Sequence, residues 1–295
     1  MSVVQFVVNG LLVGSLFATV AVGFALIWGV VDIINLAHGE MVMLGGYCSY
    51  WLIQLAGGEV SVGIALATVP VAMAVLFVVG YALQRVLIQQ VTDESLFLTL
   101  LITFGISIAI QQLAIQAWSA TPRSINVGLA DPSIFVAGLI IPKMKLLAFV
   151  GALVLTLLLW LFLKRTRRGR AIRAVAQNPQ ASELIGIDVE HTRAVTFGIS
   201  AAIAGGAGSF IGMILGLWPQ MGLNYTLKSF VIVVFGGIGS IPGALVGGLS
   251  LGTIEELTAG LVSSTWTLAV SFSLLIVLLV FKPDGLFGQS VEGEQ

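Results

Sequence analysis

The sequence predicts an all-α, polytopic integral membrane protein with about eight transmembrane segments, one or two of them broken or re-entrant. Three observations lead to this prediction: 58% of the 295 residues are hydrophobic, only 9% are charged, and the apolar residues gather in long runs. An ordinary soluble domain carries about 25% charged residues, so a soluble fold does not explain this balance. We expect residues 1–295 to form a single transmembrane domain.

The expected elements follow from the apolar runs, because a bilayer core about 30 Å thick needs roughly 20 apolar residues per helix. The first run lacks a preceding basic region and exceeds the apolar part of a signal peptide, so we expect a retained helix there. The expected continuous spans are Val3–Val31, Met41–Ala56, Val62–Leu83, Leu96–Trp118, Leu146–Leu163, Ala194–Leu217 and Trp266–Phe281, and the expected broken pair is Phe230–Gly237 with Ala244–Leu257.

The positive charge is concentrated in one polar segment. Seven of the thirteen Lys and Arg residues fall within 164–193. Loops rich in Lys and Arg stay on the cytoplasmic side, so we expect this segment inside the cell. Counting spans from it places the N-terminus outside and the C-terminus inside, which agrees with Lys282 just past the last span.

Two of the expected spans are weak. Met41–Ala56 is short and contains Gly45 and Gly46, whereas the pair Phe230–Leu257 is interrupted by glycines and a proline. Broken backbone at membrane depth occurs only where protein or a water-filled cavity covers it, and transporters place their substrate path there. We therefore expect both stretches to line or gate a path, with the candidate residues Gly236, Gly237, Gly239 and Ser240 at the second break.

The centre of the basic segment carries the start and stop signals of a short helix. Asn178 is suited to cap the helix, Pro179 fits its first position, and Gly186 fits the left-handed position after its end. We expect a rigid helix over Pro179–Ile185 that exposes Ala181 and the following leucine and isoleucine, Leu184 and Ile185. Such a helix suits docking into a groove of a soluble partner. An ordinary basic loop that only sets topology is the alternative.

Polar residues follow the first span. His38 and Glu40 lie near membrane depth, where ionisable residues are costly and often functional. Three interpretations stay open for them: a structural pair that fixes the turn and caps the next helix, path-lining groups, or a proton relay. Asn35 is expected either to hydrogen-bond exposed backbone at the break or to line the path.

Three other charged residues have plainer interpretations. Adjacent Glu255 and Glu256 point about 100° apart on a helix, so one at most faces a cavity. An interfacial helix terminus near the outer face accounts for both. Arg123 is expected in an external loop, either solvated or in contact with an external protein.

The composition excludes several functions. A net charge of −1 argues against nucleic acid as a partner. The chain has no phosphate-binding loop and no Cys/His metal spacing, so we expect no bound cofactor, no metal and no ATP hydrolysis by this chain alone. The single cysteine, Cys48, is expected to be a small buried hydrophobe.

Four motifs in chain order resemble one known family. They are residues 29–40 (GVVDIINLAHGE) followed by 43–47 (MLGGY), residues 168–187 (RGRAIRAVAQNPQASELIGI), residues 235–244 (FGGIGSIPGA), and residues 282–288 (KPDGLFG). Together they resemble the permeases of ATP-binding-cassette importers for branched-chain amino acids, and they span nearly the whole chain.

The resemblance implies an assembly in the cytoplasmic membrane of a prokaryote. It implies a second, related permease subunit, two ATP-binding subunits that use ATP and Mg²⁺, and an external substrate-binding protein. By the same resemblance, 164–193 is the cytoplasmic coupling loop, in which Asn178, Pro179, Ala181, Leu184, Ile185 and Gly186 receive the ATPase force.

Two alternatives to this function stay open. Permeases for urea and short amides resemble the same family, and the quoted motifs do not separate their cargo from branched-chain amino acids. A proton-coupled secondary transporter, in which His38 and Glu40 couple proton movement to substrate, is the rival from another class. A membrane enzyme is disfavoured because the sequence offers no nucleophile–base pair.

Overall fold

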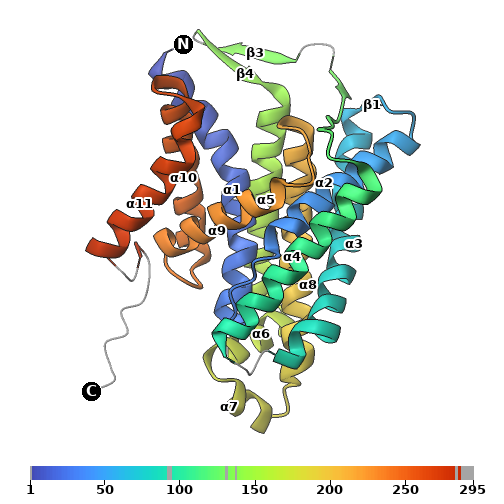
Figure 1. The fold of residues 1–295 in the computed structure, drawn as a ribbon, viewed down its shortest axis with the longest axis vertical. Coiled ribbons are helices and arrows are strands. Elements are labelled where there is room, and N and C mark those ends of the chain that lie inside the picture. The colour runs from blue at the N-terminus through green and yellow to red at the C-terminus, as the bar shows by residue number, and fades with distance from the viewer. Residues whose placement is uncertain (1, 92–94, 130–131, 137, 283–284, 287–295) are drawn as a thin grey trace.

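The computed structural model describes residues 2–91, 95–129, 132–136, 138–282 and 285–286 as an elongated bundle of helices (Figure 1). Residues 283–284 and 287–288 of the fourth motif, together with the C-terminal residues 289–295, lie outside the described residues. The helices are α1 (Val3–Val31), α2 (His38–Leu55), α3 (Val62–Leu83), α4 (Leu96–Trp118), α5 (Lys143–Arg165), α6 (Arg167–Gln177), α7 (Pro179–Leu184), α8 (Val189–Ile214), α9 (Met221–Gly236), α10 (Ile241–Leu261) and α11 (Thr267–Phe281).

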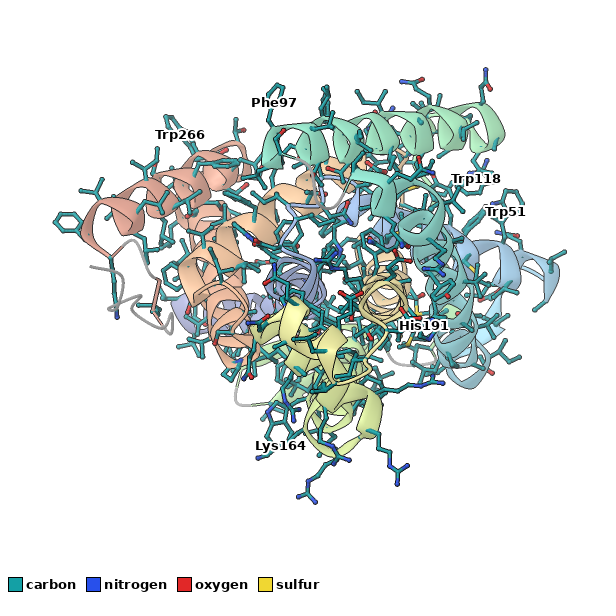
Figure 2. The ribbon with its side chains drawn as sticks, turned by 90° about the horizontal axis from the view of Figure 1, so that it is seen from below. Trp51, Phe97, Trp118, Lys164, His191 and Trp266 are labelled. Atoms are coloured by element: carbon teal, nitrogen blue, oxygen red, sulfur yellow. The ribbon has the colours of Figure 1, made fainter. Side chains whose placement is uncertain are left out.

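Helices α1 and α8 form the centre of the bundle. Their most apolar stretches are 94% and 83% buried, whereas those of α4 and α11 are 17% buried. Glycines let α1 approach α10 closely, because a Cβ added at Gly10 or Gly14 would collide with the α10 backbone near Gly252 or Gly248. The peripheral helices present apolar side chains outward, among them Phe97 and Trp266 (Figure 2).

The structure shows a polytopic helical protein but does not confirm the expected count of about eight membrane crossings. Among the described residues, six helices are long and apolar enough to cross a bilayer: α1, α3 with its π-helical and 3₁₀ extension (Gln84–Ile88, Gln89–Val91), α4, α5, α8 and α11 with its preceding 3₁₀ turn (Ser264–Trp266). The bent pair of α9 and α10, whose axes differ by 118°, makes a seventh if it counts as one span. Helix α2 does not pass this test, so the count of about eight is not confirmed. The broken pair itself is present, although α9 begins at Met221, before the predicted Phe230.

Short strands and a loop close the end of the bundle where α1 begins. Val60–Ser61 (β1) pairs in parallel with Val127–Gly128 (β2), and Ser133–Val136 (β3) pairs antiparallel with Leu139–Pro142 (β4). Arg123 is half-buried there and held by contacts within the chain. Its Nη2 donates to the Trp118 carbonyl at 2.8 Å, and its guanidinium lies 5.3 Å from the ring centroids of Tyr50 and Trp51. Helices α6 and α7 lie at the opposite end (Figure 1).

Candidate functional site

Helix α2 begins beside the middle of α1, not at its end. After α1, Asp32 adopts a left-handed conformation (φ 58°), and the chain runs through residues 33–37 before α2 starts at His38. The His38 Nε2 donates to the carbonyl oxygen of Val20 at 3.0 Å, and its ring packs edge-on against Phe24. Because Val20 lies near the centre of the 29-residue α1, the start of α2 lies at mid-height in the bundle.

Helix α9 begins at the same level, directly against α2. A Cβ added at Gly39 would overlap the carbonyl oxygen of Gly222, and the Gly39 amide donates to Thr226 Oγ1 at 2.8 Å. The first turns of two helices therefore meet inside the bundle. Paired discontinuous helices of this kind are where transporters bind and gate their substrates.

Glu40 sits at this junction and is fully buried. Its Oε1 accepts a hydrogen bond from Ser107 Oγ of α4 at 3.0 Å, whereas its Oε2 has no hydrogen-bonding partner among the described residues. A Cβ added at Gly222 would collide with this carboxylate, so Glu40 packs against the first turn of α9. The partial positive charge at a helix N-terminus favours a carboxylate in this place.

The connection from α1 to α2 is held by hydroxyl and amide groups. Asn35 Oδ1 accepts from the Ala37 amide at 3.0 Å, and Thr103 Oγ1 of α4 accepts from the Leu36 amide at 3.2 Å. Thr226 Oγ1 donates to the Leu36 carbonyl at 3.2 Å. These bonds provide partners for backbone N–H and C=O groups that lie between α1 and α2 and are not paired within a helix. Backbone groups at membrane depth need such partners because lipid offers none.

The structure thus brings Asn35, His38 and Glu40 into one closed polar cluster, and none of the three lines the cavity described below. Their contacts match the structural interpretation of these residues most directly. Sequence reasoning missed their partners Thr103, Ser107, Thr226 and Val20. Isolated hydroxyl residues inside apolar runs were the available signal for the first three.

The break between α9 and α10 is a glycine hinge. Gly237 (φ 99°) and Gly239 (φ 75°) both adopt backbone conformations that side chains disfavour. Gly236 packs directly on Gly243, where a Cβ would collide with the facing backbone. Ser240 then caps α10 by accepting from the Gly243 amide at 3.1 Å.

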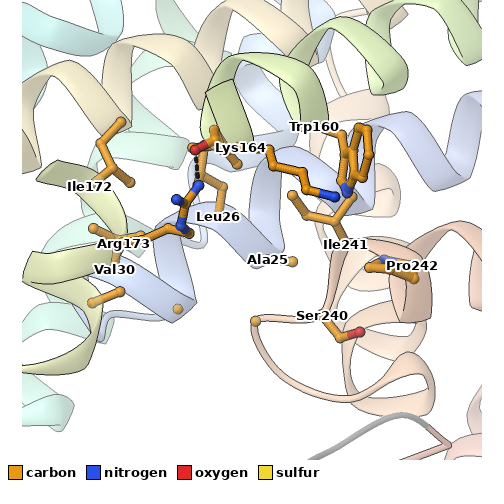
Figure 3. A pocket seen from close by; sticks show the side chains of 14 residues that line it. Ala25, Leu26, Val30, Trp160, Lys164, Ile172, Arg173, Ser240, Ile241 and Pro242 are labelled. Carbon is orange, nitrogen blue, oxygen red and sulfur yellow. Dashed lines mark hydrogen bonds between the residues drawn. The ribbon is translucent and has the colours of Figure 1, made fainter. Parts of the chain in front are cut away.

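A cavity of about 540 Å³ opens beside this hinge (Figure 3). Gly239 and Ser240 line it, but Gly236 and Gly237 do not. Its two cations come from the α5–α6 side: Lys164 lies over the Trp160 ring at 4.5 Å, and Arg173 donates to the Leu163 carbonyl. The remaining walls are mainly apolar and come from the last turns of α1, from α5 and α6, and from the start of α10; they comprise Ala25, Leu26, Gly29, Val30, Ile172, Ala176, Ile241 and Pro242.

The short helix predicted in the basic segment is present as α7. Asn178 Oδ1 caps it by accepting from the Ala181 amide at 2.9 Å, and Pro179 occupies the first position. It ends one residue before the predicted Ile185. Gly186 (φ 83°) donates to the Glu183 carbonyl, and the Ile187 amide donates to the Ser182 carbonyl, which is the paired bonding of a Schellman end.

One face of α7 is strongly apolar and open. Leu184 is 89% exposed and Ile185 is 75% exposed, and Ala181 is exposed beside them, whereas Ser182 is buried toward the bundle. Three residues after Ile185, Asp188 caps α8 by accepting from the His191 amide at 2.8 Å. The exposed apolar face of α7 is therefore joined by a very short connection to the central helix α8.

Comparison with known proteins agrees with the resemblance of the motifs. A model of the branched-chain amino acid transport system permease component family matches residues 6–279. The permease protein BraD of the high-affinity branched-chain amino acid transport system of Pseudomonas aeruginosa is 35% identical over 97% of this chain and 95% of its own length. The corresponding LivH proteins of Salmonella typhimurium and Escherichia coli are 34% and 33% identical, each over 95% of this chain and 94% of their own length. With its broken helices, its short capped helix and these matches along nearly its whole length, the chain belongs to the branched-chain amino acid transport system permease component family.

Proposed function

We propose that this chain is a transmembrane permease subunit of an ATP-binding-cassette importer that moves branched-chain amino acids across the cytoplasmic membrane of a prokaryote. The observation that supports this most is the similarity over 95–97% of the chain to permease proteins of high-affinity branched-chain amino acid systems. Urea or a short amide is the alternative cargo.

In this function, α7 is the point at which the ATPase acts. Its exposed Leu184 and Ile185 suit a hydrophobic groove on an ATP-binding subunit, and the rigid ends of α7 suit the transfer of force. Displacement of α7 reaches α8 through Ile187 and Asp188, and α8 packs against α1, α2 and α3. One short helix is thereby linked to the centre of the bundle.

The path itself runs between the mid-height junction and the hinge. The junction at Gly39 and Gly222 is closed by direct packing, whereas the cavity at Gly239 and Ser240 is lined in part by α6, next to the basic end of the bundle. We assign the open cavity to the cytoplasmic exit and the junction to a gate that opens during the cycle. The apolar walls of the cavity suit cargo with an aliphatic side chain.

The orientation and the partners complete the proposal. The basic end with α6 and α7 faces the cytoplasm, α1 begins outside, and the C-terminus is cytoplasmic. A second permease subunit, two ATP-binding subunits and an external binding protein form the assembly. ATP and Mg²⁺ act on the ATP-binding subunits, and this chain holds no cofactor.

Uptake into proteoliposomes tests this function. The chain is co-expressed with the second permease, ATPase and binding-protein genes of its own genome, and the purified assembly is reconstituted. We expect uptake of labelled leucine that requires ATP on the ATPase side and loaded binding protein on the other. Uptake driven by a proton gradient without ATP supports the secondary transporter, and uptake of urea or acetamide without leucine supports the alternative cargo.

A further inference from the structure

Lys228 of α9 and Glu255 of α10 form a buried ion pair. Lys228 Nζ lies 2.6 Å from Glu255 Oε2, and the two side chains are 19% and 7% exposed. Ser271 Oγ of α11 donates to the other carboxylate oxygen at 2.9 Å. The second ion pair in the described part of the chain, Arg85–Glu190, lies on the surface with exposures of 45% and 64%.

The buried pair lies beside the middle of the longest helix. Lys228 Nζ is 4.2 Å from the ring centroid of Phe17, which is the central residue of α1, and Tyr225 packs on the same ring. Glu255 is therefore not the interfacial helix terminus that the sequence suggested, since it is buried and α10 continues to Leu261. Charges this deep in a membrane are costly, usually pair with one another and often mark substrate paths.

The side of α9 that carries Lys228 is only partly covered by the rest of the chain. Leu223 is 39% exposed, and Asn224, Leu227 and Lys228 are partly exposed. Asn224 and Lys228 are four residues apart, so they share one face of the helix. This face runs from the junction at Gly222 toward the hinge beside the cavity, and its polar groups suit a water-filled path better than lipid tails.

We propose that the Lys228–Glu255 pair recognises the charged head group of an α-amino acid on its way through the protein. The cargo carboxylate binds Lys228 and its ammonium group binds Glu255, while Leu223 and Leu227 meet the aliphatic side chain. This inference rests on the proposed function and deepens it by naming the residues that read the cargo.

The exchange is balanced in charge. A zwitterion brings one positive and one negative group, so each protein charge changes partner and neither is left buried and unpaired. A neutral solute such as urea separates the pair without replacing the lost contacts. We therefore expect the protein to transport α-amino acids in preference to urea and amides. A neutral solute would leave the two buried protein charges unpaired, and such a penalty excludes a solute as effectively as a poor steric fit does.

A charge-free double variant tests this role. Lys228→Met with Glu255→Gln removes both charges while keeping similar side-chain volumes. In the reconstituted assembly we expect complex formation, and ATPase stimulation by loaded binding protein, within twofold of wild type. Leucine uptake should fall at least tenfold. The matched control is Thr156→Val, which removes a buried hydroxyl that contacts Thr19 elsewhere in the bundle, and it should keep uptake within twofold.

Each outcome of this experiment either supports or overturns the proposed role of the ion pair. Full leucine uptake by the double variant would mean that the ion pair only stabilises the packing of α9 against α10, which overturns the proposal. If the double variant does not assemble, Lys228→Arg is measured instead, because it keeps the positive charge but changes its geometry. Uptake at least threefold slower than wild type, with normal assembly, supports the proposal. Unchanged uptake overturns it. A wild-type assembly that takes up no leucine refutes the proposed function itself, so the two failures are distinguished.

Discussion

Gly39 and Gly222 bring the first turns of α2 and α9 into backbone contact near the middle of the bundle. Neither position has room for a Cβ, because the added atom would overlap the Gly222 carbonyl in one case and the Glu40 carboxylate in the other. The two glycines are thus required for the junction that buries Glu40. The junction, in turn, sets where both broken helices begin.

Gly39→Ala is therefore expected to destabilise the protein. Overpacking of a filled core costs about 1–3 kcal/mol, and the clash here is with backbone, which yields less easily than a side chain. Thermal unfolding in detergent should show a lower Tm, and leucine uptake should fall. The control is Gly105→Ala in α4, where an added Cβ meets nothing within 4 Å. Equal Tm values for the two variants would contradict the tight junction.

Ser107→Ala should weaken the same junction by a smaller amount. It removes the hydroxyl that donates to Glu40 Oε1, and within the part of the chain that the structure describes this carboxylate has no other side-chain hydrogen bond. Hydrogen bonds between membrane helices contribute about 0.6–1.7 kcal/mol. We expect a modest loss of thermal stability that Ser107→Thr largely restores. A full restoration by Ser107→Val instead would show that packing, not the hydroxyl, matters there.

Arg placed on the exposed face of α7 should uncouple the ATPase. Ala181→Arg or Leu184→Arg puts a charge into the proposed interface, where an uncompensated buried charge costs several kcal/mol. ATPase binding or stimulation by loaded binding protein should be lost, although the permease still inserts. Gln177→Arg, at the exposed end of α6, is the matched control and should couple normally. Full coupling in the Leu184→Arg variant would show that the exposed face of α7 is solvated and does not dock on the ATPase.

The hinge glycines should affect transport more than assembly. Gly237→Leu and Gly239→Leu place side chains on backbones with φ of 99° and 75°, which costs about 1–3 kcal/mol per residue and restricts the bend. Gly239 also borders the cavity, so a leucine there narrows it. We expect both variants to assemble and to transport slowly, measured as uptake per assembled complex. Wild-type uptake by both would remove the hinge from the path.

Cysteine labelling tests the orientation. In a Cys48→Ser background, Gln177→Cys should react with an impermeant thiol reagent in inverted vesicles and stay protected in intact cells. Gln177 suits this test because it is exposed at the end of α6 and lies outside the proposed ATPase interface, whereas Ser182 is only 3% exposed and would stay unlabelled on either side. Labelling of Gln177→Cys in intact cells would reverse the topology.

The sequence alone determined the elements whose limits depend on local chemistry. The boundaries of Val3–Val31, Val62–Leu83 and Leu96–Trp118 were predicted as they occur, because a spanning helix ends where its apolar run ends. Helix α7 was also predictable, since its capping asparagine, first-turn proline and final glycine act within a few residues of one another. The family followed from motifs for the same reason, as each is read within a short stretch.

The tertiary structure alone decided which distant residues meet and at what depth. Hydropathy marked 41–56 as a span, but the packing of Gly39 on Gly222 and the contact of His38 with Val20 place the start of α2 at mid-height in the bundle. The sequence suggested that Glu255 lies at a helix terminus, whereas the fold brings it against Lys228, 27 residues away in the chain. Such contacts depend on the path of the whole chain, and a charge or glycine has the same local pattern whether it faces water, lipid or a partner helix.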